Sequence, residues 1–292
     1  MRARIIANPA SGSFSKNLVN LIKERFNESS VFYTAKKGDA ESFASKSEEE
    51  LIFSCGGDGT FNEIVNGALK SGLKRALVYC PFGTGKDFGR SIGITGWEDL
   101  KKALDELYFA DLDAAFVEGS KTSMYFINAL DFGVGPNISS FLESHRRLGK
   151  AAIGIGLLLK VLGVKKFHVK ITCDEKEIET KTIELIVGNG RYLGAGIKVA
   201  PNSFLNDGFL DLYVINPYGP ASTLLKLKTI FDGSYVDKGY GKHFRCSRII
   251  IEPDNTKFEA DGEIFNDSSL RIKAVKSSIK VLIIRGKSGE LI

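Results

Sequence analysis

A glycine-rich segment with one acidic residue is the strongest chemical signal in this chain of 292 residues. It reads Gly56-Gly57-Asp58-Gly59-Thr60 and follows an apolar run, Leu51–Cys55, that is typical of a buried strand. Glycines at a strand end let backbone N–H groups approach a phosphate, and the start of the next helix adds a favourable dipole. Asp58 would repel a bare polyphosphate, so it suits a site where a divalent cation lies between carboxylate and phosphate. The alternative is a tight strand-to-helix turn that Asp58 or Thr60 caps.

Two further loops at predicted strand ends have the same character. Pro81-Phe82-Gly83-Thr84-Gly85 follows a later apolar run, and Asn8-Pro9-Ala10-Ser11-Gly12 follows the first one. Thr34 ends a short strand that lies between these loops in the sequence. In an open parallel sheet, ligands bind at the carboxyl ends of the strands. Small polar groups at these consecutive strand ends therefore predict a nucleotide site at one edge of the sheet.

A pair of acidic residues offers a second kind of chemistry. Asp261 and Glu263 flank one glycine after the apolar run Lys257–Ala260. On a turn, both carboxylates can face one site, where one accepts a proton or positions a metal ion while the other orients it. A plain hairpin turn is the alternative, because Asp-Gly is a common two-residue hairpin loop.

The elements that must position these groups change along the chain. Up to about residue 110, short apolar strands alternate with amphipathic helices, such as the one over 97–107, which indicates a parallel sheet covered on both faces. Beyond that point short strands predominate, interrupted by helices at about 136–162 and 220–231. We therefore expect an α/β domain over residues 1–115 and a mainly β domain over 116–284, which includes a strand at 197–199.

Composition and charge narrow the class of protein. The net charge is +5, from 40 basic and 35 acidic residues, an excess too small to indicate nucleic-acid binding. The longest apolar stretch, 153–159, is far shorter than the about 20 residues that span a bilayer, so we do not expect an integral membrane protein. The first residues lack an apolar signal core, and the four cysteines form no CxxC pair. We expect a cytoplasmic protein with reduced thiols in its core.

One segment concentrates the positive charge. Residues 143–170 hold seven Lys or Arg and one acid, so this segment carries +6 and the rest of the chain −1. Because apolar residues lie between the basic ones, a helix formed here can lie on an anionic membrane surface or line the entrance for an acyl chain. A core helix with solvated lysines at its ends is the alternative.

Taken together, these motifs resemble those of the diacylglycerol kinase catalytic-domain family, which includes bacterial diacylglycerol and related lipid kinases and the sphingosine kinases. The resemblance rests on the three loops and on Asp261-Gly262-Glu263, and it continues through Phe126-Ile127-Asn128, Gly188-Asn189-Gly190 and residues 200–208. It implies an amino-terminal, NAD-kinase-like, doubly wound α/β domain and a carboxy-terminal β-sandwich, with the active site in the cleft between them. It also implies that the tail, about 285–292, returns to the first domain.

The resemblance also implies roles for particular residues. Glu263 corresponds to the proposed general base, Asp261 is its acidic neighbour, and Asp58 lies beside a Mg²⁺ ion that screens charge. The residues expected to line the ATP site are Asn8, Pro9, Ala10, Ser11, Gly12, Thr34, Gly56, Gly57, Asp58, Gly59, Thr60, Phe61, Asn62, Gly83 and Thr84. Bacterial members carry a structural Mg²⁺, whose ligands here would be the Asp207 side chain and the carbonyls of Phe204 and Phe209.

The chain departs from the family pattern at Lys86, where the family usually has Asn. A lysine at this position would add a phosphate contact or alter the start of the following helix.

The expected activity is transfer of the γ-phosphoryl group of ATP to a lipid hydroxyl, with diacylglycerol as the first choice of acceptor and phosphatidic acid as the product. A sphingoid base or another lipid alcohol is the alternative acceptor. An NAD kinase and a nucleotide-binding regulator without catalysis are further alternatives. We expect the partner to be lipid at the membrane surface, reached by a cytoplasmic protein that is peripheral at the inner face of the membrane. A homodimer is left open.

Overall fold

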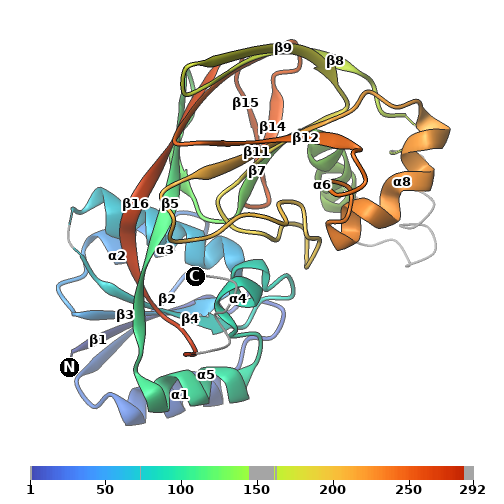
Figure 1. Cartoon of the computed structure of the whole chain (residues 1–292). Helices are drawn as coiled ribbons and strands as arrows, with labels where there is room; N and C mark the ends of the chain where they lie inside the picture. The colour runs from blue at the N-terminus through green and yellow to red at the C-terminus, as the bar shows by residue number, and fades with distance from the viewer. Residues whose placement is uncertain (1, 73, 145–160, 162, 286–292) are drawn as a thin grey trace. The chain divides into compact units, whose positions relative to one another are not determined.

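The computed structural model describes residues 2–72, 74–144, 161 and 163–285 (Figure 1). The chain divides into two compact units. The first unit consists of Met1–Ala114, Phe204–Gly208 and Val275–Ile292, and the second of Ala115–Ser203 and Phe209–Ala274. Two long strands, β5 (Phe109–Gly119) and β16 (Leu270–Leu282), run through both units.

The first unit is built on a parallel sheet. Its elements are β1 (Ala3–Ala7), α1 (Lys16–Arg25), β2 (Ser29–Tyr33), α2 (Asp39–Ser45), β3 (Leu51–Gly56), α3 (Asp58–Lys70), β4 (Ala76–Pro81), α4 (Asp87–Ile92) and α5 (Trp97–Glu106). The strand order is β2-β1-β3-β4-β16, and the pairs within it are parallel. All six residues of β3 are buried, as expected for a strand covered by helices on both faces. The predicted α/β domain is therefore confirmed.

The helix expected after Lys86 is present as α4, although no bounds were predicted for it. It has six residues, which is too short to show a helical period, and it follows Lys86, which has a positive φ of 59°.

The second unit contains two antiparallel sheets. Its elements are β6 (Ser123–Phe126), β7 (Ala129–Gly133), α6 (Val134–Ser144), β8 (Phe167–Cys173), β9 (Lys176–Thr182), β10 (Glu184–Gly188), β11 (Leu210–Ile215), α8 (Pro220–Asp232), β12 (Gly241–Cys246), β13 (Arg248–Pro253), β14 (Lys257–Ala260) and β15 (Glu263–Asn266). One sheet has the order β12-β11-β10-β7-β14-β15. In the other, the first half of β16 pairs with β13, which is followed by β8 and β9.

The apolar core of the second unit lies between these two sheets. In β8, buried Val169 and Ile171 alternate with exposed His168 and Lys170, which is the pattern of a strand with one face in water. The core includes residues of both sheets, such as Phe132, Leu185 and Leu212 from one and Ile171, Ile249 and Ile272 from the other. The predicted β-sandwich is confirmed by this packing.

Helices α6 and α8 cover the other face of the six-stranded sheet (Figure 1). A second apolar cluster lies on this face and includes Ala129, Ile186, Tyr213 and Tyr235. The helix predicted at 136–162 begins earlier, at Val134, and continues to Ser144. Residues 145–160 and 162, which hold most of the predicted basic segment, lie outside the described residues.

The strand predicted at 197–199 is not formed. Ile197 makes only an isolated bridge with Leu193, within a loop that contains the left-handed residues Gly194, Ala195 and Gly196. The positive φ angles of these three residues prevent an extended ladder on that side. The chain returns to the first unit from Val275 onward, where β16 pairs with β4. The tail expected to return, about 285–292, lies outside the described residues beyond Arg285.

Two of the four cysteines are paired, which corrects the prediction of four reduced thiols. Cys173 at the end of β8 and Cys246 at the end of β12 form a disulfide with a Cα–Cα distance of 5.6 Å, and it links the two sheets of the second unit. Their neighbours also interact, because the Asp174 carboxylate accepts hydrogen bonds from the Ser247 N–H (3.1 Å) and the Arg248 N–H (2.9 Å). Cys55 and Cys80 are free and buried, as predicted.

Of the helices in the described part of the chain, none has the length and apolar character needed to cross a bilayer.

The disulfide predicts a redox-dependent stability. We expect reduction of the wild type to lower the free energy of unfolding by about 2–4 kcal/mol, because the unfolded chain loses a closed loop. A Cys173→Ser/Cys246→Ser variant should resemble the reduced wild type and should not respond to reductant. Chemical unfolding with and without dithiothreitol measures both effects. An equal response of the variant to reductant would contradict the assignment.

Candidate functional site

Three loops of the first unit meet at the carboxyl edge of its sheet. The Asn8 side-chain amide donates to the Thr60 hydroxyl at 3.1 Å, which joins the end of β1 to the first turn of α3, directly after β3. The side-chain oxygen of Asn8, Oδ1, accepts from the Ala10 N–H at 3.0 Å and so holds the turn after β1. The Ser13 N–H donates to the Phe82 carbonyl at 2.9 Å, which joins the same loop to the end of β4. The convergence expected from the strand ends is thus present within this unit.

The two glycine loops touch through their backbones. A Cβ atom added at Gly83 would lie 2.5 Å from the Gly57 Cα atom, so only glycine fits at this contact. Helix α3 begins directly after Gly57, which has no side chain to cap it. The first N–H groups of a helix have no partner within the helix and favour an anion. The loop edge and the start of α3 together are therefore suited to bind phosphate.

Asp58 is held by donors on neighbouring elements. One of its carboxylate oxygens accepts from the Tyr79 hydroxyl at 3.1 Å and from the Phe88 N–H at 3.3 Å, and the other accepts from the Asp87 N–H at 3.2 Å. Burial raises the pKa of Tyr79, and the Asp58 charge adds to the effect, so this hydroxyl stays a donor. Asp58 thus ties the first glycine loop to the start of α4. Its expected place beside Mg²⁺ stays a prediction.

The other residues predicted to line the ATP site differ in how far they are exposed. Phe61 is fully buried and stacks on Phe88 with centroids 4.6 Å apart, so it presents no surface to a ligand. Pro9, Ala10, Gly12, Gly59 and Thr84 are exposed, while Asn62 and Thr34 are half-buried. The Thr34 N–H donates to the Ala7 carbonyl at 2.9 Å and extends the β1–β2 pairing.

Glu63 is a residue to which the sequence analysis gave no role. Its carboxylate accepts from the Gly38 N–H at 3.0 Å and from the Ala40 N–H at 3.2 Å, at the start of α2. These bonds position the loop that follows Thr34. The partners lie more than 20 residues earlier in the chain, so local spacing could not have found them.

The predicted structural metal site includes Asp207 and Phe204, which belong to the first unit, while Phe209 begins the next segment of the second unit. The structure adds buried Asp113, whose carboxylate accepts from the Gly208 and Ser277 N–H groups, each at 2.6 Å. Burial raises the pKa of Asp113, and the charge of Asp207 acts in the same direction.

The ligands predicted for the structural metal are one carboxylate and backbone carbonyls, which are hard oxygen donors that suit Mg²⁺. A cation here would offset the repulsion between Asp113 and Asp207. Among the described residues, no group of three or more His, Cys, Asp or Glu side chains could hold a metal ion.

In the second unit, Asp261 and Glu263 have different surroundings. Asp261 and Gly262 have φ angles of 46° and 86° and form the two-residue loop between β14 and β15, so the hairpin turn is present. The buried Asp261 carboxylate accepts from the N–H groups of Ile127 (2.7 Å), Asn128 (2.8 Å) and Ala129 (3.2 Å). Its part is therefore to anchor the turn to the start of β7. Glu263 begins β15 and is half-buried.

Asn189 completes this anchor. Its side-chain amide donates to the Ile127 carbonyl at 2.8 Å, and its N–H donates to the Asn128 carbonyl at 2.9 Å. The motif Gly188-Asn189-Gly190 thus packs against the segment that Asp261 holds. No role for this motif was predicted from its residues.

A second group of carboxylates lies at the start of α6. Glu184 accepts from the N–H groups of Val134 and Gly135, and buried Asp131 and Glu259 are its acidic neighbours on β7 and β14. Burial raises the pKa of Glu184, with the charge of Glu259 adding to the effect. Burial and the charges of Glu184 and Glu259 raise the pKa of Asp131 in the same way. A carboxyl in this group therefore keeps its proton to a higher pH than in the unfolded chain.

Comparisons with known proteins agree with this architecture. Residues 130–283 match the YegS C-terminal NAD kinase beta sandwich-like domain, and residues 2–117 match the diacylglycerol kinase catalytic domain. A diacylglycerol kinase of Bacillus subtilis is 29% identical over 277 residues, covering 90% of this chain and 89% of that protein. A crystal structure of a diacylglycerol kinase from Bacillus anthracis superposes with a TM-score of 0.78 at 26% identity, covering 97% of each chain. An NAD kinase from Archaeoglobus fulgidus, solved with ATP, shares the fold with a TM-score of 0.53 at 14% identity, covering 100% of this chain and 97% of that one.

An α/β unit whose strand-end loops suit phosphate, together with a β-sandwich unit, defines the fold that lipid kinases share with NAD kinases. The chain belongs to the diacylglycerol kinase catalytic-domain family, a family of lipid kinases.

The backbone conformation and the hydrogen bond of Lys86 explain how this lysine is accommodated before α4. It precedes α4 with φ 59° and ψ 34°, a left-handed conformation that Asn adopts more readily than Lys. Its ammonium group donates to the Thr95 carbonyl at 2.8 Å. The lysine therefore bonds to its own unit, and the Asn usual in the family suits the backbone better.

We expect Lys86→Asn to raise the free energy of unfolding by about 0.5–1 kcal/mol, because Asn adopts the left-handed conformation before α4 with less strain than Lys. The control is Lys101→Asn on the exposed face of α5, where the lower helix propensity of Asn should reduce stability slightly. Urea unfolding of the three proteins measures the difference. A loss of stability in Lys86→Asn equal to that of the control would contradict the account.

The Glu184 group predicts that stability falls as pH rises. The unfolded carboxyl loses its proton near its ordinary pKa of 4.5, whereas the folded one keeps it longer, so stability is lost as pH rises from there through the raised folded pKa. Glu184→Gln removes one of the two carboxyls whose pKa is raised, so it should reduce the slope of unfolding free energy between acidic and alkaline pH, and Asp131 accounts for the slope that remains. Glu177→Gln, on the exposed part of β9, is the control and should leave the profile unchanged. A wild-type slope retained in Glu184→Gln would refute this origin.

Proposed function

We propose that this protein transfers the γ-phosphoryl group of ATP to a lipid hydroxyl, with diacylglycerol as the acceptor and phosphatidic acid as the product. The observation that carries the proposal is the backbone contact of Gly57 and Gly83 beside the uncapped start of α3. The name of the Bacillus subtilis relative supports the choice of acceptor. We also propose that the enzyme is cytoplasmic and reaches its substrate at the surface of the membrane.

The phosphates of ATP would be held by backbone groups of the first unit. The N–H groups at the start of α3 point along the helix axis and carry partial positive charge, which favours the β- and γ-phosphates. Asn8 and Thr60 are bonded to each other at the same edge, so they keep the first two loops in register. Phosphoryl transfer depends mostly on such positioning and on neutralisation of charge.

Mg²⁺ bound near Asp58 would supply charge neutralisation to the transferring group. Through its bonds with Tyr79 and the start of α4, Asp58 would also hold the second glycine loop in place. Its role is then both electrostatic and positional.

Glu263 would act as the general base of the reaction. As the lipid hydroxyl oxygen forms its bond to the γ-phosphorus, the hydroxyl proton passes to the Glu263 carboxylate. The bond from the γ-phosphorus to the bridging oxygen breaks at the same time, and ADP leaves with that electron pair. Asp261 supports this step by anchoring the turn before Glu263 to the N–H groups of Ile127, Asn128 and Ala129.

The direct test is incubation of the purified protein with labelled ATP and one candidate acceptor at a time. Diacylglycerol in mixed micelles should yield phosphatidic acid, identified by its mass, at a higher kcat/KM than sphingosine or NAD. Preferred phosphorylation of a sphingoid base would change the acceptor, and phosphorylation of NAD would make the enzyme an NAD kinase. ATP binding without transfer to any member of a lipid extract would favour a non-catalytic regulator.

Substitution of the proposed base tests the mechanism. We expect Glu263→Gln to lower kcat by about 10²–10⁴-fold, because it removes the proton acceptor, while the KM for ATP changes little. Glu252→Gln, on the exposed part of β13 in the same unit, is the control and should keep full activity. Asp58→Ala should lose both activity and stability, since the start of α4 loses its acceptor. Normal turnover in folded Glu263→Gln would remove this residue from the mechanism.

A further inference from the structure

Three buried carboxyl groups lie on adjacent strands, on the face of the six-stranded sheet that α6 covers. Asp131 on β7 is paired directly with Glu259 on β14, and Glu184 on β10 faces the same side because it pairs with Gly133, two residues after Asp131. Asp131, Glu184 and Glu259 are 4%, 6% and 3% exposed. Among the described residues, no basic side chain forms an ion pair with Asp131 or Glu184. A buried carboxyl without such a partner reduces its charge by keeping a proton.

The side chains of Asp131 and Glu184 are joined by a hydrogen bond. An ionised carboxylate can accept a hydrogen bond but cannot donate one, so this bond requires a proton on one of the two groups. Glu184 also accepts from the N–H groups of Val134 and Gly135, which favours its charged form. The Asp131 Oδ1 atom is buried and has no hydrogen-bond partner among the described residues, which makes a charge on Asp131 costly. These contacts place the proton on Asp131, which donates it to Glu184.

The first turn of α6 separates this pair from water. A Cβ atom added at Gly135 would overlap with the Asp131 carboxyl group, so the backbone of the helix lies directly against it. The turn is held to the sheet by the two N–H bonds to Glu184 and by the Asn137 side-chain amide, which donates to the Gly133 carbonyl at 2.7 Å. On this side, water reaches Asp131 when the start of α6 moves away.

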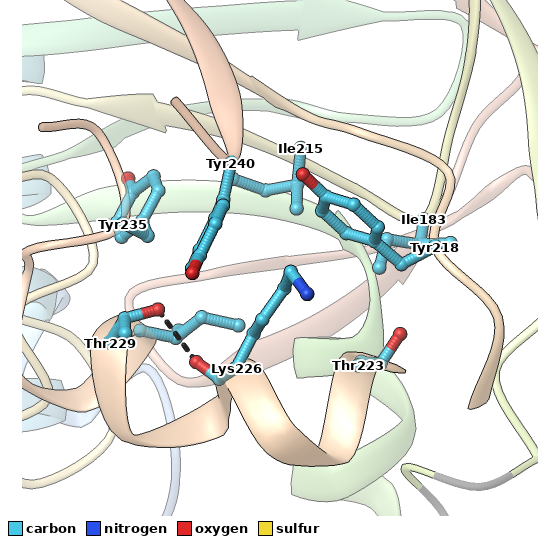
Figure 2. Close-up of a pocket in the computed structure, with 9 residues that line it drawn as sticks. Ile183, Ile215, Tyr218, Thr223, Lys226, Thr229, Tyr235 and Tyr240 are labelled. Carbon is cyan, nitrogen blue, oxygen red and sulfur yellow. Dashed lines mark hydrogen bonds between the residues drawn. The ribbon is translucent and has the colours of Figure 1, made fainter. Parts of the chain in front are cut away.

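The elements on the α8 side supply no positive charge to the pair. Tyr235 is the titratable group that acts on Glu184 from the segment after α8, and burial raises the pKa of Tyr235, so it stays uncharged. Tyr235 lines a small cavity beneath α8 together with Lys226, as Figure 2 shows. The Lys226 ammonium nitrogen lies 4.5 Å from the ring centroid of Tyr218 and 4.8 Å from that of Tyr240. This lysine is therefore engaged with the two rings.

The elements on the β14 side also leave the pair without a cation. Lys257 of β14 donates to the Ser140 hydroxyl of α6. On β15, Glu263 pairs with Ala260 and so lies on the opposite face of the sheet from Glu259. The described side chains of α6 itself include no titratable group. Glu259 is thus the charged group that faces Asp131 from this side, and its charge opposes ionisation of Asp131.

We propose that Asp131 and Glu184 form a pH-sensitive switch for α6, in which protonated Asp131 keeps the first turn of the helix closed on the sheet and its ionisation releases that turn. Helix α6 also contacts β14 and β15, the strands on either side of the turn that Asp261 anchors. Release of α6 therefore loosens the support of that turn. The proposal does not depend on the proposed function, because it concerns the fold of the second unit without a ligand.

The direction of the effect follows from the change in the surroundings of Asp131. With α6 closed, burial and the charges of Glu184 and Glu259 raise the pKa of Asp131. With α6 open, water solvates the carboxyl group and its pKa returns toward the ordinary value of 3.8. Opening is therefore coupled to loss of a proton. Its equilibrium constant should rise by up to about tenfold per pH unit, from the ordinary pKa until the raised pKa is passed.

Amide hydrogen exchange of the purified protein, without ATP or lipid, measures this opening at several pH values. Exchange times are scaled to cancel the intrinsic effect of pH on exchange, and residues 134–144 are compared with buried β11 in the same samples. We expect the protection of α6 to fall by up to about tenfold per pH unit, while that of β11 falls much less. Protection of α6 that does not change with pH would overturn the proposal. An equal decline in both elements would also overturn it, since the carboxyls would then act on the whole unit.

Asp131→Asn tests which group holds the proton, because an amide of the same shape donates to Glu184 at every pH. This variant should lose most of the pH dependence and keep α6 as protected as in the wild type at low pH. Glu259→Gln removes the charge that faces Asp131 and should weaken the dependence. Glu177→Gln, on the exposed part of β9, is the control and should behave like the wild type.

Circular dichroism shows whether each variant is folded. The full wild-type pH dependence in folded Asp131→Asn would overturn the proposal. Should Asp131→Asn fail to fold, the same result in Glu259→Gln would overturn it. An equal loss of pH dependence in Glu177→Gln would do so as well, because the effect would then not belong to the buried group.

Discussion

The contact between Gly57 and Gly83 is the constraint on which the phosphate-suited edge of the first unit depends. Strands β3 and β4 are parallel neighbours with Gly56 opposite Pro81, so the loops that leave them are one strand spacing apart. A Cβ atom at Gly83 would lie 2.5 Å from the Gly57 Cα atom, and any side chain there would force the loops apart. With side chains excluded, backbone groups form the edge. The glycines at positions 57 and 83 are therefore required by the packing of the two loops, in addition to the proposed binding of phosphate.

In both units, carboxylate side chains hold backbone segments in place by accepting hydrogen bonds from their N–H groups. Asp58 holds the start of α4, Glu63 the start of α2, Asp113 the segments at Gly208 and Ser277, and Asp261 the segment 127–129. A hydrogen bond to a charged carboxylate is stronger than one between neutral groups, which helps to offset the cost of burial. Several acids of the family motifs are therefore part of the architecture. This is compatible with the proposal that Glu263 accepts the proton.

Much of the fold could be predicted because its signals are local. Strand–helix alternation, the glycine loops and the short strands of the second half each lie within a few residues of chain. The long-range pairs could not be predicted in this way. Cys173 and Cys246 are 73 residues apart, and Asp113 bonds to groups 95 and 164 residues away. Edge strands such as β9, with three lysines or glutamates in its first four residues, lack the apolar alternation that marks a strand facing the core.

The different surroundings of Asp261 and Glu263 could not be predicted from their spacing in the sequence. In an extended strand, residues two apart share one face, so sequence alone treats the two carboxylates as equivalent. Asp261 and Gly262 both have positive φ, and this reverses the chain between β14 and β15. Asp261 is thereby buried against three N–H groups of the segment 127–129, while Glu263 begins the next strand. A carboxylate whose oxygens already accept these bonds is a poor acceptor for a further proton. The hairpin turn thus gives different surroundings to two residues that the motif presents as a pair, in agreement with the different roles proposed for them.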